Sequence, residues 1–183
     1  DKRITAEVCV HHLWFDESRY KDLGTRIKCN PAIKSVSDRE ALIRAVNEDR
    51  IDIIATDHAP HTASEKGETY FKAPAGLPLV QHVMLCLFDM AQNGQLDYER
   101  IVDKTAHAVA DIFGVVDRGY VREGYFADLV LMDPDHPTLV QPSNLYAKCH
   151  WSPFEGHTFH SSVDTTIVNG VIVYADGKVT GEI

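Results

Sequence analysis

One continuous stretch decides the fold of this chain, and it reads Ile51-Asp52-Ile53-Ile54-Ala55-Thr56-Asp57-His58-Ala59-Pro60-His61. Its apolar first half, residues 51–56, predicts a buried β-strand that ends at Asp57, with two histidines close behind. Ionisable groups are expensive to desolvate, so their place at a strand end indicates contact with a metal ion or a substrate. In α/β barrels this end of the strands forms the active-site face. The alternative is that Asp57 caps a helix and that the histidines are surface residues.

The sequence before this stretch predicts the first half of a βαβ unit. Residues 4–10 are rich in β-branched side chains and predict a strand, with His11 and His12 at its end. Neighbouring side chains on a strand point to opposite faces, so we expect this pair to pack in the structure and not to share a metal ion. After a polar loop over residues 16–36, a Ser-x-x-Glu capping box at residues 37–40 predicts a helix.

The sequence after the stretch predicts helices and then a small β module. Apolar residues at helical spacing over 80–91 predict a core-facing helix that ends at Gly94. Asp97 and Thr105 are expected to cap two short helices, the second of which ends at Gly114. Beyond residue 118 the pattern changes to short strands, and the pair Asn169-Gly170 between two of them predicts a hairpin. We therefore divide the chain into residues 1–118 and residues 119–183.

Composition places the chain among ordinary globular proteins and excludes several partners. It has 183 residues, of which 44% are hydrophobic and 25% charged, and its net charge of −9 argues against nucleic acid. No apolar run approaches the ~20 residues that a membrane span needs. The four cysteines include no CxxC pair, so we expect free thiols in a reducing cytoplasm.

Four segments carry a resemblance to a known family. The run Ala-Thr-Asp-His-Ala-Pro-His-Thr at 55–62, followed by Glu-Lys at 65–66, resembles the strand-8 signature of dihydroorotases in the amidohydrolase superfamily. Residues 6–13 resemble the strand-7 segment of that family, and residues 30–31 and 73–78 match in order and approximate spacing. The resemblance implies an α/β fold: the C-terminal part of a (β/α)8 TIM-like barrel, about strands 7 and 8, plus part of a small composite β-sandwich domain.

The resemblance also implies roles for individual residues. Asp57 corresponds to a metal ligand that is also the catalytic proton carrier of a zinc pair. The residues that correspond to substrate-binding positions are Asn30, His61, Ala75 and Gly76. The family's other zinc ligands, on strands 1, 4, 5 and 6, have no counterpart in this sequence. We therefore expect the isolated chain to be inactive.

A complete barrel needs about 250 residues, and this sequence supplies two strand-plus-helix units and no initiating Met. We expect the chain to be the C-terminal part of a longer protein, with the N-terminal half of that protein as its first partner. The resemblance implies zinc-dependent, reversible hydrolysis of dihydroorotate to N-carbamoyl-aspartate in pyrimidine (UMP) biosynthesis, by a homodimer or an assembly with aspartate transcarbamoylase. The alternatives are a hydantoinase- or allantoinase-type enzyme and a non-catalytic structural partner of another enzyme.

Overall fold

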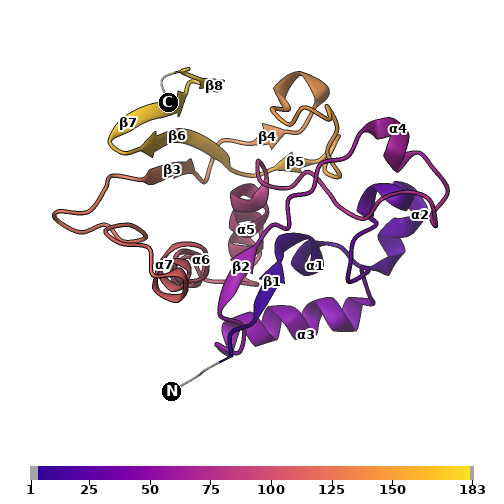
Figure 1. Cartoon of the computed structure of the whole chain (residues 1–183), viewed down its shortest axis with the longest axis horizontal. Helices are drawn as coiled ribbons and strands as arrows, with labels where there is room; N and C mark the ends of the chain where they lie inside the picture. The colour runs from indigo at the N-terminus through magenta and orange to yellow at the C-terminus, as the bar shows by residue number, and fades with distance from the viewer. Residues whose placement is uncertain (1–3, 182–183) are drawn as a thin grey trace.

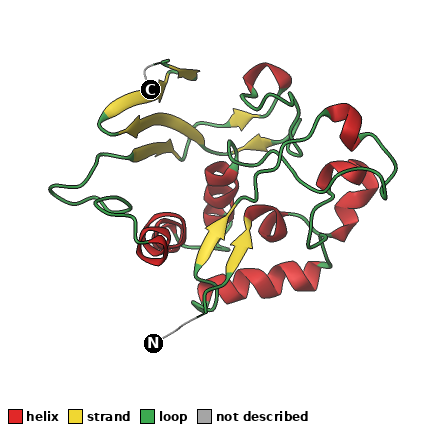
Figure 2. Cartoon of the chain, viewed as in Figure 1, coloured by secondary structure: helices red, strands yellow, loops and turns green. Residues whose placement is uncertain are grey.

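Two parallel strands form the centre of the N-terminal half of the fold (Figures 1 and 2). In the computed structural model, which describes residues 4–181, β1 (Glu7–Cys9) pairs with β2 (Ile53–Ala55), and Val8 lies opposite Ile54. The Asp52 carboxylate accepts a 2.7 Å hydrogen bond from the Ala6 backbone N–H and fixes the start of the pair. The expected βαβ unit is therefore present.

The expected first strand is shorter than the sequence indicated, and the two histidines after it are helical. The chain turns into helix α1 (Val10–Trp14) directly after Cys9, because Val10 and Leu13, three residues apart, both enter the core. The rings of His11 and His12 lie 4.2 Å apart between centroids. His11 and His12 therefore lie on a helix and not on a strand, and the prediction that their side chains point to opposite faces of a strand is wrong.

The connection between the two strands contains more helix than expected. The loop expected over residues 16–36 contains three short helices, which are η1 (Glu17–Arg19), α2 (Tyr20–Leu23) and η2 (Gly24–Ile27). The main helix α3 (Val36–Asn47) begins at a capping box, but this box is formed by Ser35 and Asp38 and not by residues 37 and 40. The predicted helix is thus confirmed and its cap is corrected by two residues.

The helices after β2 differ from the prediction at their starts. The loop after residue 61 contains the short helix α4 (Ala63–Lys66), and α5 (Val83–Gln92) begins three residues later than Val80, which is 58% exposed. The segments α6 (Tyr98–Val102), η3 (Asp103–His107, a π-helix) and α7 (Ala108–Phe113) follow one another without a break. Thr105 lies inside this run, where its hydroxyl donates to the Ile101 carbonyl, so it caps no helix. Gly114 ends α7 at a φ of 63°, as predicted.

The C-terminal part contains an antiparallel sheet of four strands in the order β3 (Leu129–Asp133), β6 (Ser162–Val168), β7 (Val171–Ala175) and β8 (Lys178–Val179). The predicted hairpin joins β6 to β7, and both turn residues, Asn169 and Gly170, have a positive φ. The chain between β3 and β6 forms two short paired strands, β4 (Thr138–Leu139) and β5 (Thr158–Phe159), and the 3₁₀ helix η4 (Pro142–Asn144). In Figure 1 the sheet lies at upper left, above α6 and α7.

The core joins the two halves of the sequence. Phe154 and Phe159, from the segment between β3 and β6, belong to the same buried cluster as Val8 and Leu87. The Phe154 ring stacks on Phe15 with centroids 5.3 Å apart. The proposed domain boundary at residue 118 stays a prediction. The four cysteines are free, as expected, and none of the helices within residues 4–181 is long and apolar enough to cross a bilayer.

Candidate active site

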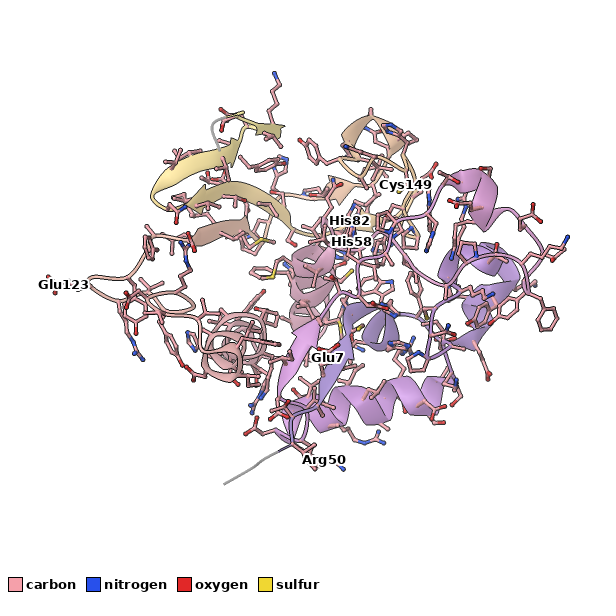
Figure 3. The ribbon with its side chains drawn as sticks, viewed as in Figure 1. Glu7, Arg50, His58, His82, Glu123 and Cys149 are labelled. Atoms are coloured by element: carbon pink, nitrogen blue, oxygen red, sulfur yellow. The ribbon has the colours of Figure 1, made fainter. Side chains whose placement is uncertain are left out.

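A groove of about 700 Å³ runs along β1 and α3, from Arg50 before β2 to Asp57 after it. Asp57 follows β2 on an exposed turn with a φ of 46°, and it lines the groove together with Asn30, Cys9 and His12. Since parallel strands end at the same edge of a sheet, β2 and the segment after β1 bring these side chains together. Figure 3 shows Glu7, another lining residue, on β1. The structure therefore places two of the five expected site residues in one groove.

The other three expected site residues form a second group on the loop after β2. The half-buried His61 ring contacts the Ala75 carbonyl through Nε2 at 3.1 Å, and because a carbonyl only accepts, Nε2 carries the proton. Gly76 follows with a φ of 136° and donates its N–H to the Lys28 carbonyl at 2.9 Å. His61, Ala75 and Gly76 are not among the residues that line the groove of Asp57. They are connected to it through Lys28, two residues before Asn30.

Gly76 occupies a position where the backbone passes too close to its neighbours for a side chain. A Cβ there would lie 2.7 Å from both the Cβ and the carbonyl oxygen of Ala59. We expect Gly76→Ala to lower the free energy of unfolding by at least about 2 kcal/mol, from the clash and the positive φ together. Urea unfolding measures this change. Gly94→Ala, at a φ of 70° in open space, is the control for a positive φ without a clash, and equal losses in the two variants would contradict the clash.

Lys66 joins the two groups of residues, and sequence reasoning gave it no role. Its side chain is 1% exposed, and its ammonium donates to the carbonyls of Lys28 (3.2 Å), Pro74 (3.0 Å) and Gly76 (2.9 Å). The charge is thus shared among three backbone acceptors. Burial lowers the pKa of Lys66 to about 8. The capping box of Thr62 and Glu65 begins α4 and so places Lys66 at the end of this short helix, but it does not predict what the ammonium contacts.

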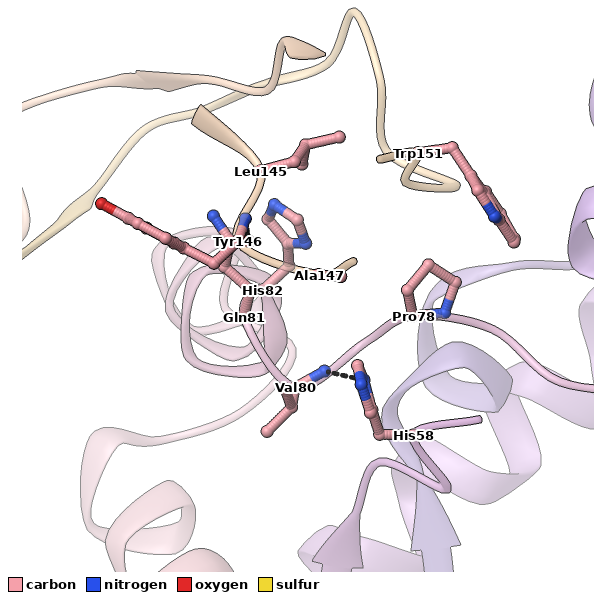
Figure 4. A pocket seen from close by; sticks show the side chains of 9 residues that line it. All are labelled: His58, Pro78, Val80, Gln81, His82, Leu145, Tyr146, Ala147 and Trp151. Atoms are coloured by element: carbon pink, nitrogen blue, oxygen red, sulfur yellow. Dashed lines mark hydrogen bonds between the residues drawn. The ribbon is translucent and has the colours of Figure 1, made fainter. Parts of the chain in front are cut away.

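His58 also has a role that its position in the sequence did not reveal. Its Nδ1 accepts the backbone N–H groups of Leu79 (2.9 Å) and Val80 (3.1 Å), so the ring proton of the neutral imidazole is on Nε2. Figure 4 shows the ring facing the Val80 amide at one wall of a pocket of about 250 Å³. His58 therefore fixes the chain before α5 against the end of β2.

The implied zinc pair can be tested against these residues. Of the ligands that the family resemblance implies, only Asp57 is present, and it is exposed after the end of β2. Zinc is ordinarily held by at least three protein ligands. The Asp57 carboxylate alone does not fit a zinc pair.

The fold and the sequence together define the class of protein. The chain belongs to the amidohydrolase family, because the model of that family matches residues 2–173. It is 43% identical to the dihydroorotase of Halobacterium salinarum over 84% of this chain and 36% of that protein. It is 37% identical to the dihydroorotase of Clostridium acetobutylicum over 94% of this chain and 41% of that protein.

A solved structure shows the same architecture. The L-hydantoinase (dihydropyrimidinase) from Arthrobacter aurescens superposes with a TM-score of 0.92 at 25% identity, over 97% of this chain and 41% of that one. The α/β fold is therefore part of an amidohydrolase barrel, as predicted. The chain spans about two fifths of the length of the relatives that it matches.

Proposed function

We propose that this chain forms part of a dihydroorotase, which interconverts dihydroorotate and N-carbamoyl-aspartate. The observation that carries the proposal is that Asp57, which follows the carboxyl end of β2, lines one groove with Asn30. The identity of 43% with a dihydroorotase supports this choice of substrate. The remaining strands of the barrel, from an N-terminal half of the same protein, are the partner that the proposal requires.

The residues of this chain suit two parts of the reaction. Hydrolysis adds water to the ring carbonyl, breaks the C–N bond and leaves a proton on the departing ring nitrogen. The Asp57 carboxylate can take the proton from the attacking water and return it to that nitrogen, which is general base and then general acid catalysis. The Asn30 side chain offers one acceptor and two donor hydrogens to a planar ring amide.

The finer parts of the proposal concern the whole protein. The zinc pair belongs to it only if the other strands supply the ligands that are missing here. We propose pyrimidine biosynthesis as the pathway and the cytoplasm as the location, which four free thiols support. A homodimer or an assembly with aspartate transcarbamoylase completes the proposal.

His61 is proposed to bind substrate by holding the Ala75–Gly76 segment in place. We expect His61→Ala to raise KM by about 10-fold or more with a smaller effect on kcat, because loss of binding that is equal in ground and transition state appears in KM. His61→Gln, which keeps an N–H donor at a similar reach, is the matched control. Steady-state kinetics and metal analysis of both variants test this role, and loss of metal at an unchanged KM would contradict it.

The activity of the chain itself tests the proposal. The 183-residue chain alone is expected to leave dihydroorotate unchanged with zinc present, and co-production with the remaining barrel strands is expected to restore turnover. Activity of the chain alone would show that Asp57 does not depend on ligands from other strands. If the co-produced protein folds, binds metal and remains inactive on every cyclic amide, the protein is a non-catalytic structural partner of another enzyme.

A second enzymatic candidate rests on the structural match. The L-hydantoinase of Arthrobacter aurescens has the same fold over nearly the whole chain, so a hydantoinase- or allantoinase-type ring specificity is the alternative. The two candidates share the chemistry of Asp57 and differ in the ring that the groove accepts.

A further inference from the structure

Three side chains with metal-binding atoms meet where β1 passes into α1. The ligand atoms of Cys9, His11 and His12 all lie within 4.8 Å of one another. The chain changes from strand to helix directly after Cys9, so the three residues lie on either side of this junction. None of the three belongs to the zinc pair that the family resemblance implies.

His11 lacks the hydrogen bonds that a buried imidazole needs. The residue is 1% exposed, and neither ring nitrogen has a partner with strict hydrogen-bond geometry among residues 4–181, although the Thr56 backbone lies close enough to oppose the lowering of the His11 pKa by burial. A buried polar group without a partner costs about 1–3 kcal/mol. Since one of these nitrogens lies within 4.8 Å of the Cys9 sulfur, a cation between the two would satisfy it.

His12 is oriented as a metal-binding histidine would be. Its Nε2 lies 2.8 Å from the carbonyl oxygen of Pro31. The carbonyl only accepts, so Nε2 carries the proton and Nδ1 has its lone pair free. Histidines that bind metals usually donate their second ring N–H to a carbonyl or carboxylate in this way, which fixes the ring and the tautomer.

We propose that Cys9, His11 and His12 bind a thiophilic divalent cation such as Zn²⁺ or Cd²⁺. One thiolate and two imidazoles are a ligand set that these ions favour. Tetrahedral zinc places its ligand atoms about 3.3–3.8 Å apart, so the three side chains close by roughly 1 Å around the ion. Binding releases the Cys9 thiol proton to solvent. Water takes the fourth position, because Cys9 and His12 line the groove described above.

Titration of the 183-residue chain with Cd²⁺ tests this site, followed by the thiolate-to-metal absorption band and by calorimetry. We expect one ion per chain and a higher Tm in its presence. Cys9→Ser and His12→Gln are each expected to weaken binding by more than about 100-fold, beyond the effect of losing an outer-shell partner. Cys149→Ser is the matched control, because Cys149 is a half-buried free thiol like Cys9.

The outcomes separate this site from the proposed activity. His61→Ala, which lies outside the groove, is expected to bind Cd²⁺ as the wild type does, so the test does not depend on turnover of dihydroorotate. If Cys149→Ser weakens binding as much as Cys9→Ser, the ion binds thiols in general and the site is refuted. Loss of binding in His61→Ala, or full binding in a folded His12→Gln variant, would also refute the assignment of these three ligands.

Discussion

Replacing Asp57 with Asn in the intact barrel is expected to reduce kcat by more than about 10³-fold, within the range for loss of a general base. The amide that replaces the carboxylate cannot accept the proton of the attacking water. The fold should change little, because Asn tolerates a positive φ better than most residues and Asp57 has a φ of 46° on an exposed turn. Steady-state kinetics and thermal unfolding of the same preparation measure the two effects separately.

Asp117 supplies the control for this substitution. It is also an exposed aspartate with a positive φ, 56°, and it lies far along the chain from the groove. We expect Asp117→Asn to leave kcat unchanged. If Asp57→Asn also retained a wild-type kcat, Asp57 would not be the proton carrier.

Replacing Lys66 with Met is expected to lower the free energy of unfolding by about 3–5 kcal/mol. Methionine fills a similar volume, but the carbonyls of Pro74 and Gly76 then lose their buried donor, at about 1–3 kcal/mol for each group left without a partner. The Lys28 carbonyl loses one of two donors and keeps the Gly76 N–H. Urea unfolding with an unchanged m-value would report the loss directly. Lys72→Met, at an exposed position six residues on, should change stability by less than about 0.5 kcal/mol. Equal stability of both variants would contradict the role of Lys66.

The same lysine predicts a dependence of stability on pH. The pKa of Lys66 is about 8 in the folded chain against 10.5 for an exposed lysine, so between these values the unfolded chain binds more protons than the folded chain. Stability contributed by Lys66 therefore rises as the pH increases from about 8 to 10.5. We expect the stability difference between the wild type and Lys66→Met to grow over this window. A difference that shrinks there would contradict the lowered pKa.

Local signals in the sequence predicted the elements that depend on few residues. Asn169 and Gly170 have the positive φ that a two-residue hairpin turn requires, and that requirement is visible in the sequence alone. The strand before Asp57 was predicted from its short apolar run, and α3 was predicted from a capping box and one apolar face. The start of α1 was not, because a short apolar run near His11 does not distinguish strand from helix. Burial of Val10 and Leu13 by distant residues decided it.

The roles of the candidate site residues stay predictions, and the structure adds their positions. The resemblance singled out Asp57 and Asn30, and the structure places both in one groove. The role of Lys66 depends on contacts with Lys28 across 38 residues, and that of His58 on amides more than 20 residues away. No local pattern encodes such contacts, so only the folded chain shows them.

The relative kcat/KM of the intact protein for three cyclic amides tests the central claim most directly. A groove whose polar groups pair with one ring leaves some of them unpaired when an analogue binds. The kcat/KM for that analogue is then lower by a factor of about 10² or more. We therefore predict that kcat/KM for dihydroorotate exceeds the values for hydantoin and for allantoin by at least about 100-fold. A preference for hydantoin or allantoin in the metal-loaded protein would contradict the assignment as a dihydroorotase.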